Sequence, residues 1–439
     1  MLSLRLTYMP SYPDALPCEI ATQFSIGRGE VWSCFHLAYL TTPTDMSKQT
    51  ETFFAPCPRG LEAVLRTELE QLGAQDVTDL PGGVFFTGPF ALCYAVNLHS
   101  RIASRVLWRV FHGNYRDEHD IFQAAHALPW HEWFPVSRTI KVKVSAQQCR
   151  LNSLDFVTLR IKDAVCDRFR VATGVRPNVA TRRPDIRIDA FLDRQTVMLY
   201  LDTSGEALFK RGLRTADTEA PVRENLAAGI LRLVGWTAQQ PLLDPMCGGG
   251  TFLLEAALIA RNIPPGLGRR FAFEKLSTFD AREWQAQCEA GRARQMPRTP
   301  CALYGSDIHG AAIQAARANL KAAGLGDAVA LKQADVLDIK PPTGEGMLVT
   351  NPPYGVRLGD EEQLAAFYPR LGDSLKQNFA GWRAYLFTAD LRLPKLIGLA
   401  ASRRTPLFNG PLECRLFEFK IVSGTMRKQK VAADEAEKT

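Results

Sequence analysis

Residues 242–260 read LLDPMCGGGTFLLEAALIA, and no other stretch of the chain says as much about its fold. The short apolar run Leu242-Leu243 ends at Asp244, and three glycines follow at 248–250. An apolar segment long enough for a helix then begins at Thr251. Glycine lets a ligand approach the backbone closely, and the first turn of a helix opens onto the same place. The stretch therefore predicts a strand, a ligand-binding loop and a helix. It is neither a P-loop nor a dinucleotide loop, because it lacks Lys-Ser/Thr and the G-x-G-x-x-G spacing.

Acidic residues also follow the next two predicted strands. Asp307 ends the strand that begins at Leu303, and Asp335 follows the apolar run 329–331. The first carboxylate can accept hydrogen bonds from two ribose hydroxyls, and the second can accept one from an adenine amine. Each acid taken alone is more typical of a loop or a helix cap. All three acids, counting Asp244, lie at or just after the end of a predicted strand. This repeated position favours a shared role in binding one ligand.

A fourth motif, Asn351-Pro352-Pro353-Tyr354, follows the apolar run 347–349. The Asn side-chain oxygen and a nearby backbone carbonyl can both accept from an exocyclic NH2 group. The prolines hold these acceptors in place because their φ is fixed, and Tyr354 offers a face on which a base can stack. Alone, the tetrapeptide is equally typical of a turn that ends a strand.

This order of motifs resembles class I S-adenosylmethionine-dependent methyltransferases, in particular the amine-methylating group with an N/D-P-P-Y/F motif. The resemblance implies an α/β, Rossmann-like domain, S-adenosylmethionine as cofactor, and in-line methyl transfer without a metal or a covalent intermediate, so that orientation does most of the work. It implies that the glycine loop faces the methionine part, Asp307 the ribose and Asp335 the adenine. The implied cofactor residues are Asp244, Pro245, Cys247, Gly248, Gly250, Asp307, Asp335 and Asn351, and the implied catalytic residues are Asn351, Pro352 and Tyr354.

Charge is concentrated in one part of the chain. Residues 138–187 contain twelve Lys/Arg and four Asp/Glu, a net +8 against +7 for the whole chain. A local basic field of this kind suits a polyphosphate partner, although a solvated helix and sheet face can carry the same charges. The candidate RNA-binding residues are Arg160, Lys162, Arg168, Arg170, Arg182 and Arg183, with Arg357 beside the fourth motif as a further candidate.

The hydrophobic pattern divides the chain into an α+β half and an α/β half. Residues 52–112 read β-α-β-β-α-β, as in a ferredoxin-like unit, and 119–205 contain a helix and three strands of a second α+β unit. From residue 214 strands and helices alternate, with strand ends predicted at Asp244, Ser306, Gln333, Thr350 and Thr388. Residues 262–300 interrupt this pattern with an Arg-rich insertion. Its composition fits either an RNA-facing wall or a solvated helical excursion, and we expect the excursion for most of it.

The N-terminal pair of units resembles the ferredoxin-like plus THUMP module of RNA-modifying enzymes. Motifs from Arg59-Gly60-Leu61-Glu62 through Leu201-Asp202-Thr203-Ser204-Gly205 to Asn409-Gly410-Pro411-Leu412 resemble bacterial 23S rRNA guanine-N2 methyltransferases over about residues 52–422. Departures are Gly249 for a usual Ser and Leu213 for a usual aromatic residue. Some relatives carry a second methyltransferase domain that makes 7-methylguanine, and this chain ends soon after the first domain.

We therefore expect five segments. They are an N-terminal extension at 1–45, disordered or upstream of a natural start at Met46; a ferredoxin-like domain at 46–115; a THUMP RNA-binding domain at 116–207; a class I methyltransferase domain at 208–422; and a disordered tail at 423–439. The ten scattered cysteines lack a C-x-x-C motif, the histidine spacing fits no metal motif, and no apolar run reaches membrane-spanning length. These features favour a cytoplasmic protein without a bound metal or a membrane segment.

The expected function is transfer of a methyl group from S-adenosylmethionine to the N2 amine of a guanine in 23S rRNA, as naked RNA or in a large-subunit precursor, by a monomer. The tetrapeptide does not separate N2 of guanine from N6 of adenine, so a tRNA guanine-N2 enzyme and a DNA adenine-N6 enzyme stay open. A third alternative is a non-catalytic RNA-binding ribosome assembly factor that keeps the cofactor fold. The unbroken series of Asp244, Asp307, Asp335 and Asn351 weighs against it.

Overall fold

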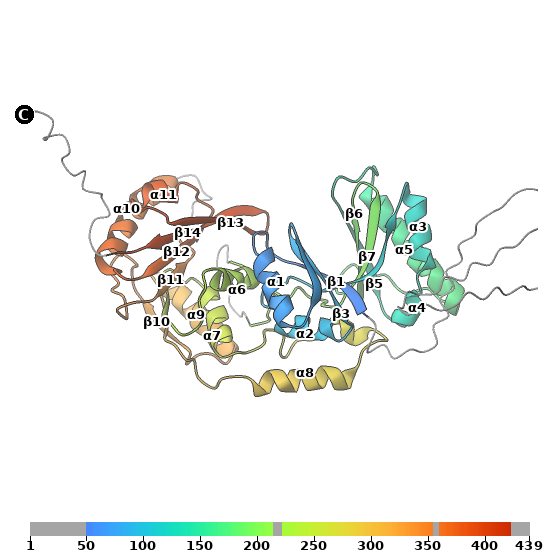
Figure 1. Cartoon of the computed structure of the whole chain (residues 1–439), viewed down its shortest axis with the longest axis horizontal. Coiled ribbons are helices and arrows are strands. Elements are labelled where there is room, and N and C mark those ends of the chain that lie inside the picture. Colours follow the sequence, from blue (N-terminus) through green and yellow to red (C-terminus); the bar gives the residue numbers. More distant parts are fainter. Residues whose placement is uncertain (1–49, 214–221, 354–359, 423–439) are drawn as a thin grey trace, which may run out of the picture. The chain divides into compact units, whose positions relative to one another are not determined.

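The computed structural model describes residues 50–213, 222–353 and 360–422, which belong to one compact unit. The expectations for the extension at 1–45, the tail at 423–439, Tyr354 and Arg357 lie outside these residues. The described chain forms two seven-stranded sheets (Figure 1). Every helix among these residues is too short or too polar to span a bilayer.

The first sheet begins with the predicted β-α-β-β-α-β order. Its elements are β1 (Thr50–Pro56), α1 (Glu62–Gln71), β2 (Gln75–Leu80), β3 (Gly83–Pro89), α2 (Leu92–His99) and β4 (Leu107–Asn114). The turn between β2 and β3 contains Gly82 at φ +91°, a conformation that glycine adopts without strain. The hydrophobic alternation of these strands thus predicted the elements to within a few residues.

The second α+β unit continues the same sheet. It contains α3 (Glu118–Ala127), α4 (Trp130–Trp133), β5 (Ile140–Ala146), α5 (Leu154–Thr173), β6 (Ile186–Leu192) and β7 (Thr196–Asp202). Because β4 pairs with β7, the strand order is β2-β3-β1-β4-β7-β6-β5, one hydrogen-bonded sheet across both units. The pattern did not predict α3, although Asp117 caps it by accepting from the backbone N–H groups of His119 and Asp120.

Helices cover one face of this first sheet. Phe53 and Trp108 are cross-strand neighbours, and both rings contact Phe90 at the start of α2, at centroid distances of 6.5 and 5.0 Å. The Trp108 ring also contacts Trp133 of α4 at 5.5 Å. Since cross-strand partners share a face, Leu201 opposite Trp108 lies on this covered face as well.

The second sheet is the predicted α/β half. Its elements are α6 (Glu224–Leu233), β8 (Leu242–Asp244), α7 (Thr251–Ala260), a 3-10 helix η2 (Ala272–Lys275), α8 (Ala281–Ala293), β9 (Leu303–Asp307), α9 (Gly310–Ala322), β10 (Val329–Gln333), β11 (Met347–Thr350), α10 (Asp360–Asn378), β12 (Arg383–Thr388), α11 (Leu393–Leu396), β13 (Arg403–Asn409) and β14 (Leu412–Lys420). The strand order is β10-β9-β8-β11-β12-β14-β13, and the first five strands are parallel. β14 runs antiparallel to both neighbours.

Both faces of the second sheet are buried. Leu242 and Met347 belong to the core cluster that includes side chains of α6, α7 and α9, whereas their chain neighbours Leu243 and Leu348 belong to the cluster of α10 and α11 (Figure 1). Successive strand residues point to opposite faces, so a sheet with helices on both sides needs continuous apolar runs. The run at 347–349 is such a segment.

A buried polar junction joins the two halves. The guanidinium of Arg211 bonds the carboxylate of Glu255 on α7 at 3.1 Å and donates to the backbone oxygen of Arg101 at 2.6 Å. The side chains of Arg211 and Glu255 are 2% and 0% exposed. Asn225 of α6 donates to the backbone oxygen of Ile102 at 3.0 Å. The helix that follows the glycine loop is thereby tied to the segment before β4.

The insertion at 262–300 is only partly the solvated excursion that we expected. α8 is mostly exposed, but Phe273 is fully buried and its ring lies 4.6 Å from that of Tyr94 on α2. Trp284 of α8 packs edge-on against Phe273 at 5.1 Å. The insertion is therefore part of the contact with the first sheet, held by aromatic residues that its Arg-rich composition hides.

Candidate active site

The predicted cofactor residues meet at one edge of the second sheet. Asp244, Asp307 and Thr350 end the parallel strands β8, β9 and β11, which are neighbours in the sheet. Ligands of open α/β sheets bind outside the carboxyl ends of such strands. Asn351 follows β11 directly, and Asp335 follows β10 by two residues. The structure thus brings Asp244, Asp307, Asp335 and Asn351 to a common edge.

The glycine loop between β8 and α7 has the backbone geometry that its sequence indicates. Gly248 and Gly250 have φ of +52° and +79°, in the left-handed region that favours glycine. The backbone N–H of Cys247 donates to Ser306 at 2.9 Å, and Asn319 of α9 donates to the backbone oxygen of Gly249 at 3.0 Å. The loop is therefore held from β9 and α9, and it leads into the N-terminus of α7.

Asp244 is a buried carboxyl group. It accepts hydrogen bonds from the Thr350 hydroxyl at 2.7 Å and from the Met246 backbone N–H at 3.3 Å. Burial raises the pKa of Asp244 to about 7, against the lowering effect of these two donors, and the negative charge of Asp307 adds to the rise. A cationic group placed beside Asp244 would favour the ionised form.

Asp307 and Asp335 both bind the backbone that surrounds them. Asp307 accepts from the N–H groups of Gly248 and His309, each at 2.9 Å. The residue that we expect to bind the ribose therefore also connects the glycine loop to β9. Asp335 accepts from the Leu337 N–H at 2.9 Å. Each carboxylate oxygen can accept more than one hydrogen bond, so both groups keep acceptor capacity for a ligand.

Asn351 carries an orphaned acceptor. Its Oδ1 atom is buried, and within residues 50–213, 222–353 and 360–422 it has no hydrogen-bond partner. The next residue, Pro352, is buried, and the backbone oxygen of Pro353 accepts from the Tyr368 hydroxyl of α10 at 2.9 Å. Buried polar atoms are nearly always paired, so an unpaired oxygen at a strand edge indicates an absent donor.

Cys247 and Pro245 complete the loop but offer no reactive group. The Cys247 thiol is buried, and burial raises its pKa far above the ordinary thiol value, so it stays protonated. Sequence reasoning did not identify Thr350, Asn319 or Tyr368. Thr350 adjoins Asn351, which is a weak signal, whereas Asn319 and Tyr368 come from helices whose placement the sequence does not show.

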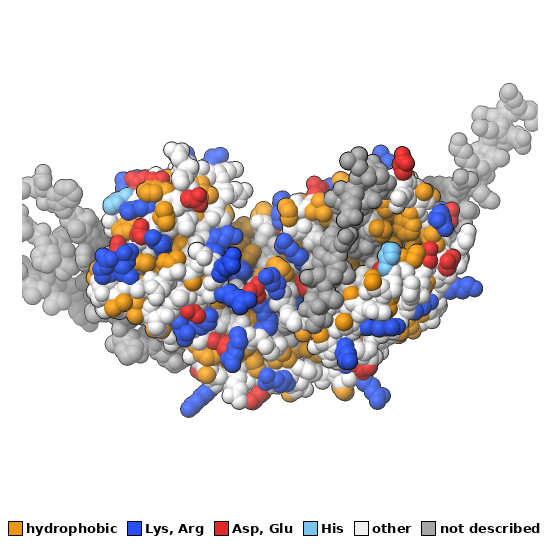
Figure 2. Space-filling model, turned by 180° about the vertical axis from the view of Figure 1, so that it is seen from behind, with side chains coloured by type: hydrophobic (Ala, Val, Ile, Leu, Met, Phe, Trp, Pro, Cys, Tyr) orange, Lys and Arg blue, Asp and Glu red, His pale blue; other side chains and the backbone are white. Residues whose placement is uncertain are grey.

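The predicted RNA-binding residues that the structure describes differ in their surroundings. Lys162 pairs with Asp163 at 2.8 Å, Arg170 approaches Asp167 at 4.0 Å, and Arg160 lies 4.2 Å above the Phe122 ring. Arg168 is half-buried, and Arg182 and Arg183 are exposed in the segment before β6. Figure 2 shows Lys and Arg side chains interspersed with acidic and apolar ones on the visible face.

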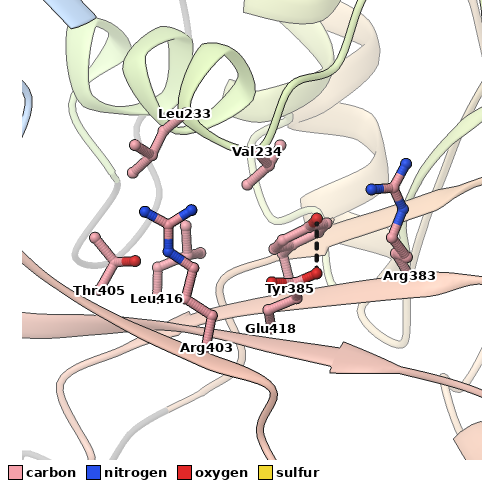
Figure 3. Close-up of a pocket in the computed structure, with 8 residues that line it drawn as sticks. All are labelled: Leu233, Val234, Arg383, Tyr385, Arg403, Thr405, Leu416 and Glu418. Carbon is pink, nitrogen blue, oxygen red and sulfur yellow. Dashed lines mark hydrogen bonds between the residues drawn. The ribbon is translucent and has the colours of Figure 1, made fainter. Parts of the chain in front are cut away.

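A shallow pocket lies away from these residues, between the end of α6 and the β12, β13 and β14 strands (Figure 3). Arg383 and Arg403, which begin β12 and β13, are among its lining residues, and the Tyr385 hydroxyl contacts the Glu418 carboxylate at 3.4 Å. Because β11 and β12 are parallel, the start of β12 lies at the sheet edge opposite Asn351. We assign the chemistry to the Asn351 edge.

Comparisons with known proteins identify the domains of the chain. Residues 211–418 match the RMKL-like methyltransferase domain, 115–202 the THUMP domain and 52–107 the RlmL ferredoxin-like domain. A putative RNA methyltransferase from Synechocystis sp. is 38% identical over 376 residues, which cover 85% of this chain and 98% of the relative. The chain belongs to the RMKL-like methyltransferase family. The expected fold class, a Rossmann-like methyltransferase domain behind a ferredoxin-like and THUMP module, is confirmed.

Some relatives of this chain are longer. Ribosomal RNA large subunit methyltransferase K/L from Shewanella sp. (strain MR-4) is 39% identical over 381 residues, which cover 86% of this chain and 53% of the relative. The chain thus spans about half the length of such curated relatives. A crystal structure of a putative methyltransferase complexed with SAH covers 86% of this chain, with a TM-score of 0.78 and 30% identity, and is itself covered in full.

Proposed function

We propose that this chain is an S-adenosylmethionine-dependent RNA methyltransferase that modifies the exocyclic N2 amine of a guanine in 23S ribosomal RNA. Membership of a methyltransferase family, a THUMP domain, and relatives named for large-subunit ribosomal RNA support the enzyme class and the RNA substrate. A solved relative holds SAH, the demethylated product of this cofactor, which supports the cofactor.

The observation that carries the proposal is the unpaired Oδ1 atom of Asn351. An exocyclic amine supplies the donor that this buried oxygen lacks. The neighbouring Pro352 has no N–H to compete for the oxygen, and Tyr368 holds the backbone of Pro353 from α10. The acceptor is therefore fixed in position before the base arrives, which is what orientation-dependent transfer requires.

The residues at the strand edge fit the cofactor. The Gly248–Gly250 loop leaves backbone groups accessible, Asp307 and Asp335 keep acceptor capacity for ribose hydroxyls and an adenine amine, and Asp244 can stabilise a cationic amine. When bound, S-adenosylmethionine would supply an electrophilic methyl group on sulfur. Asp307 has two functions in this arrangement, because it also positions the loop.

In the proposed reaction Asn351 accepts a hydrogen bond from the target amine and orients it. This bond draws electron density toward nitrogen, which opposes delocalisation of its lone pair into the ring. The N–C bond forms as the S–C bond breaks, and the amine proton leaves to solvent after transfer. Asn351 contributes position and polarisation, and no side chain acts as a strong base.

The test is methyl transfer from labelled S-adenosylmethionine to ribosomal RNA from a strain that lacks this gene, followed by nucleoside mass spectrometry. We expect N2-methylguanosine in 23S rRNA with the wild-type chain and at least about 100-fold slower formation with Asn351→Ala. N2-methylguanosine in tRNA alone, or N6-methyladenosine, would move the substrate to one of the alternatives. A cofactor-bound chain that methylates neither naked RNA nor large-subunit precursor particles would favour the assembly-factor hypothesis.

A further inference from the structure

One face of the first sheet lies opposite its helices, and its composition differs from that of the covered face. Phe54 pairs with Phe85 on β3 and with Leu107 on β4, so these three side chains share a face. Arg109 of β4 and Tyr200 of β7 are partners on the same face. Lys141 of β5 is opposite Arg187, and Lys143 is opposite Asp189. We call Phe54, Phe85, Arg109, Tyr200, Lys141 and Lys143 the open face.

The rings of the open face contact one another rather than a helix. The Phe54 ring lies 4.8 Å from Phe85 and 6.3 Å from Tyr200, centroid to centroid. Arg109 lies above the Phe85 ring at 5.6 Å and donates to the Thr52 hydroxyl at 3.2 Å. Phe54, Phe85 and Arg109 are half-buried, so part of each side chain is accessible, whereas Tyr200 is only 3% exposed and packs against the Phe54 ring. This arrangement is a preformed aromatic surface with a guanidinium beside it.

The charge of the open face is not cancelled by acids. Its neighbours Asp189 and Asp202 are paired with Arg187 and Arg105. Within the part of the chain that the structure describes, no acid forms an ion pair with Arg109, Lys141 or Lys143. On α5, by contrast, Asp163 and Asp167 lie within 4.0 Å of Lys162, Arg170 and Arg176. The three cations of the open face are thus not neutralised by acids, and Lys141 also donates to the Thr181 backbone oxygen at 2.9 Å.

We propose that the open face binds single-stranded RNA that flanks the target base, with bases stacked on Phe54 and Phe85 and phosphates bound by Arg109, Lys141 and Lys143. Sequence-tolerant binding of single strands combines aromatic stacking with a cationic track, and both are present here. The stacking rings and the cations extend over the sheet from β3 to β5, on strands spaced by about 4.8 Å. This distance is long enough for several nucleotides. The inference rests on the proposed RNA substrate, and it places the RNA on the opposite side of the sheet from α5.

The test uses the full chain and a fluorescein-labelled single-stranded RNA of mixed sequence, about twelve nucleotides long, with affinity measured by anisotropy. Phe54→Leu with Phe85→Leu keeps the apolar volume but removes the rings, and we expect about tenfold weaker binding with an unchanged salt dependence. Lys141→Gln with Lys143→Gln should reduce the slope of log affinity against log salt by about 1.4. Binding of S-adenosylmethionine should be unchanged in all four substitutions.

The matched controls lie on the helix-covered side. Phe156→Leu removes a ring of α5 that is 49% exposed, and Arg116→Gln removes an exposed charge beside α3; neither should change RNA affinity. Photo-cross-linking with 4-thiouridine in the same RNA gives a second readout that does not depend on the variants. Cross-links should fall on peptides that contain Phe54 or Phe85.

The outcomes separate this inference from the proposed function. If the wild-type chain methylates ribosomal RNA but the open-face variants bind RNA normally and cross-links fall on α5, the inference is overturned and the proposed function stands. The same holds if Arg168→Gln with Arg170→Gln weakens binding while the open-face variants do not. If the cofactor-bound wild-type chain neither binds nor methylates RNA, both are overturned.

Discussion

The first sheet is covered by helices on one face, whereas the second is covered on both. The strands of the second sheet therefore read as apolar runs such as Met347–Val349, and its polar groups are confined to loops at one edge. The strands of the first sheet alternate, and every second residue is free to be polar or aromatic. In the second sheet, residues that bind a ligand are therefore found at the edge formed by the strand ends. In the first sheet, the uncovered face can also carry such residues.

This difference predicts where substitutions act on chemistry and where they act on binding. Changes at the edge of the second sheet should alter transfer or cofactor affinity and leave RNA affinity unchanged. Changes on the open face should do the reverse. The buried junction at Arg211 and Glu255 is the place where the two sheets depend on each other.

The largest effect is expected at this junction. Glu255→Ala leaves the buried Arg211 charge without its carboxylate, and removing one partner of a buried pair costs about 3–5 kcal/mol. Urea unfolding measures the loss. Glu206→Ala, which breaks the exposed pair with Lys210, is the control and should cost less than about 1 kcal/mol. Equal effects of the two substitutions would mean that the sheets are held together elsewhere.

The next effect tests the edge alone. Asn351→Ala removes the acceptor for the target amine, and we expect transfer to slow by about 100-fold to 1,000-fold, as when an oriented polar group is removed from an active site. Affinities for S-adenosylmethionine and for RNA should change less than about twofold. Asn152→Ala, at an exposed position, serves as the control. A comparable loss of cofactor binding would make Asn351 a structural residue.

A pH-dependent effect of a few kcal/mol is expected at Asp244. Its pKa is raised from 3.8 to about 7 in the folded chain, so folding favours the protonated form. Asp244 therefore does not lower the free energy of unfolding below about pH 4, where it is protonated in both the folded and the unfolded chain. As pH rises from 4 toward 7, the free energy of unfolding falls, because the unfolded chain releases this proton and the folded chain keeps it. Asp244→Asn should raise the free energy of unfolding more at pH 8 than at pH 5, and the difference between the two pH values should be about 3 kcal/mol.

The same substitution should weaken cofactor binding, because the neutral amide cannot stabilise a cationic amine. In the wild-type chain, affinity for S-adenosylmethionine should rise between pH 5.5 and 7 as Asp244 ionises, and this dependence should disappear in Asp244→Asn. Thermal unfolding and calorimetric titration give the two readouts. Asp338→Asn, an exposed acid, is the control, and a pH dependence of binding that persists in Asp244→Asn would assign it to another group.

The smallest effect is expected at Tyr368. Tyr368→Phe deletes the hydroxyl that donates to the backbone oxygen of Pro353, and one such bond is worth about 1 kcal/mol. We expect transfer to slow about fivefold with RNA affinity unchanged. Tyr304→Phe, whose hydroxyl makes no hydrogen bond among the described residues, is the matched control. An unchanged rate in Tyr368→Phe would show that the Asn351 segment is held without α10.

Most of the fold follows from local patterns in the sequence. Strand ends predicted at Asp244, Gln333, Thr350 and Thr388 are those of the structure, because apolar runs and the polar residues after them mark where a buried strand stops. The sequence did not reveal that β4 pairs with β7. That pairing joins segments far apart in the chain, and period-2 alternation indicates a half-buried strand without naming its neighbour.

The candidate site was predictable where its chemistry depends on residue type and position after a strand. Asp244, Asp307 and Asn351 are such residues. Their partners were not predictable, since Asn319 and Tyr368 reach the site from helices, and only tertiary packing brings them there. The RNA-binding residues on α5 stay a prediction, because counting charges along the chain does not reveal which of them lie beside an acid, as Lys162 and Arg170 do.

The β4–β7 ladder has a practical consequence for work with fragments. The ferredoxin-like match ends at residue 107 and the THUMP match begins at 115, so a cut between them looks natural from the sequence. In the structure that cut would divide a continuous ladder and leave β7 with a bare row of backbone donors and acceptors. Exposed strand edges of this kind recruit other chains. A fragment that begins at residue 115 should therefore self-associate, whereas one that begins at residue 50 keeps every strand of the sheet paired.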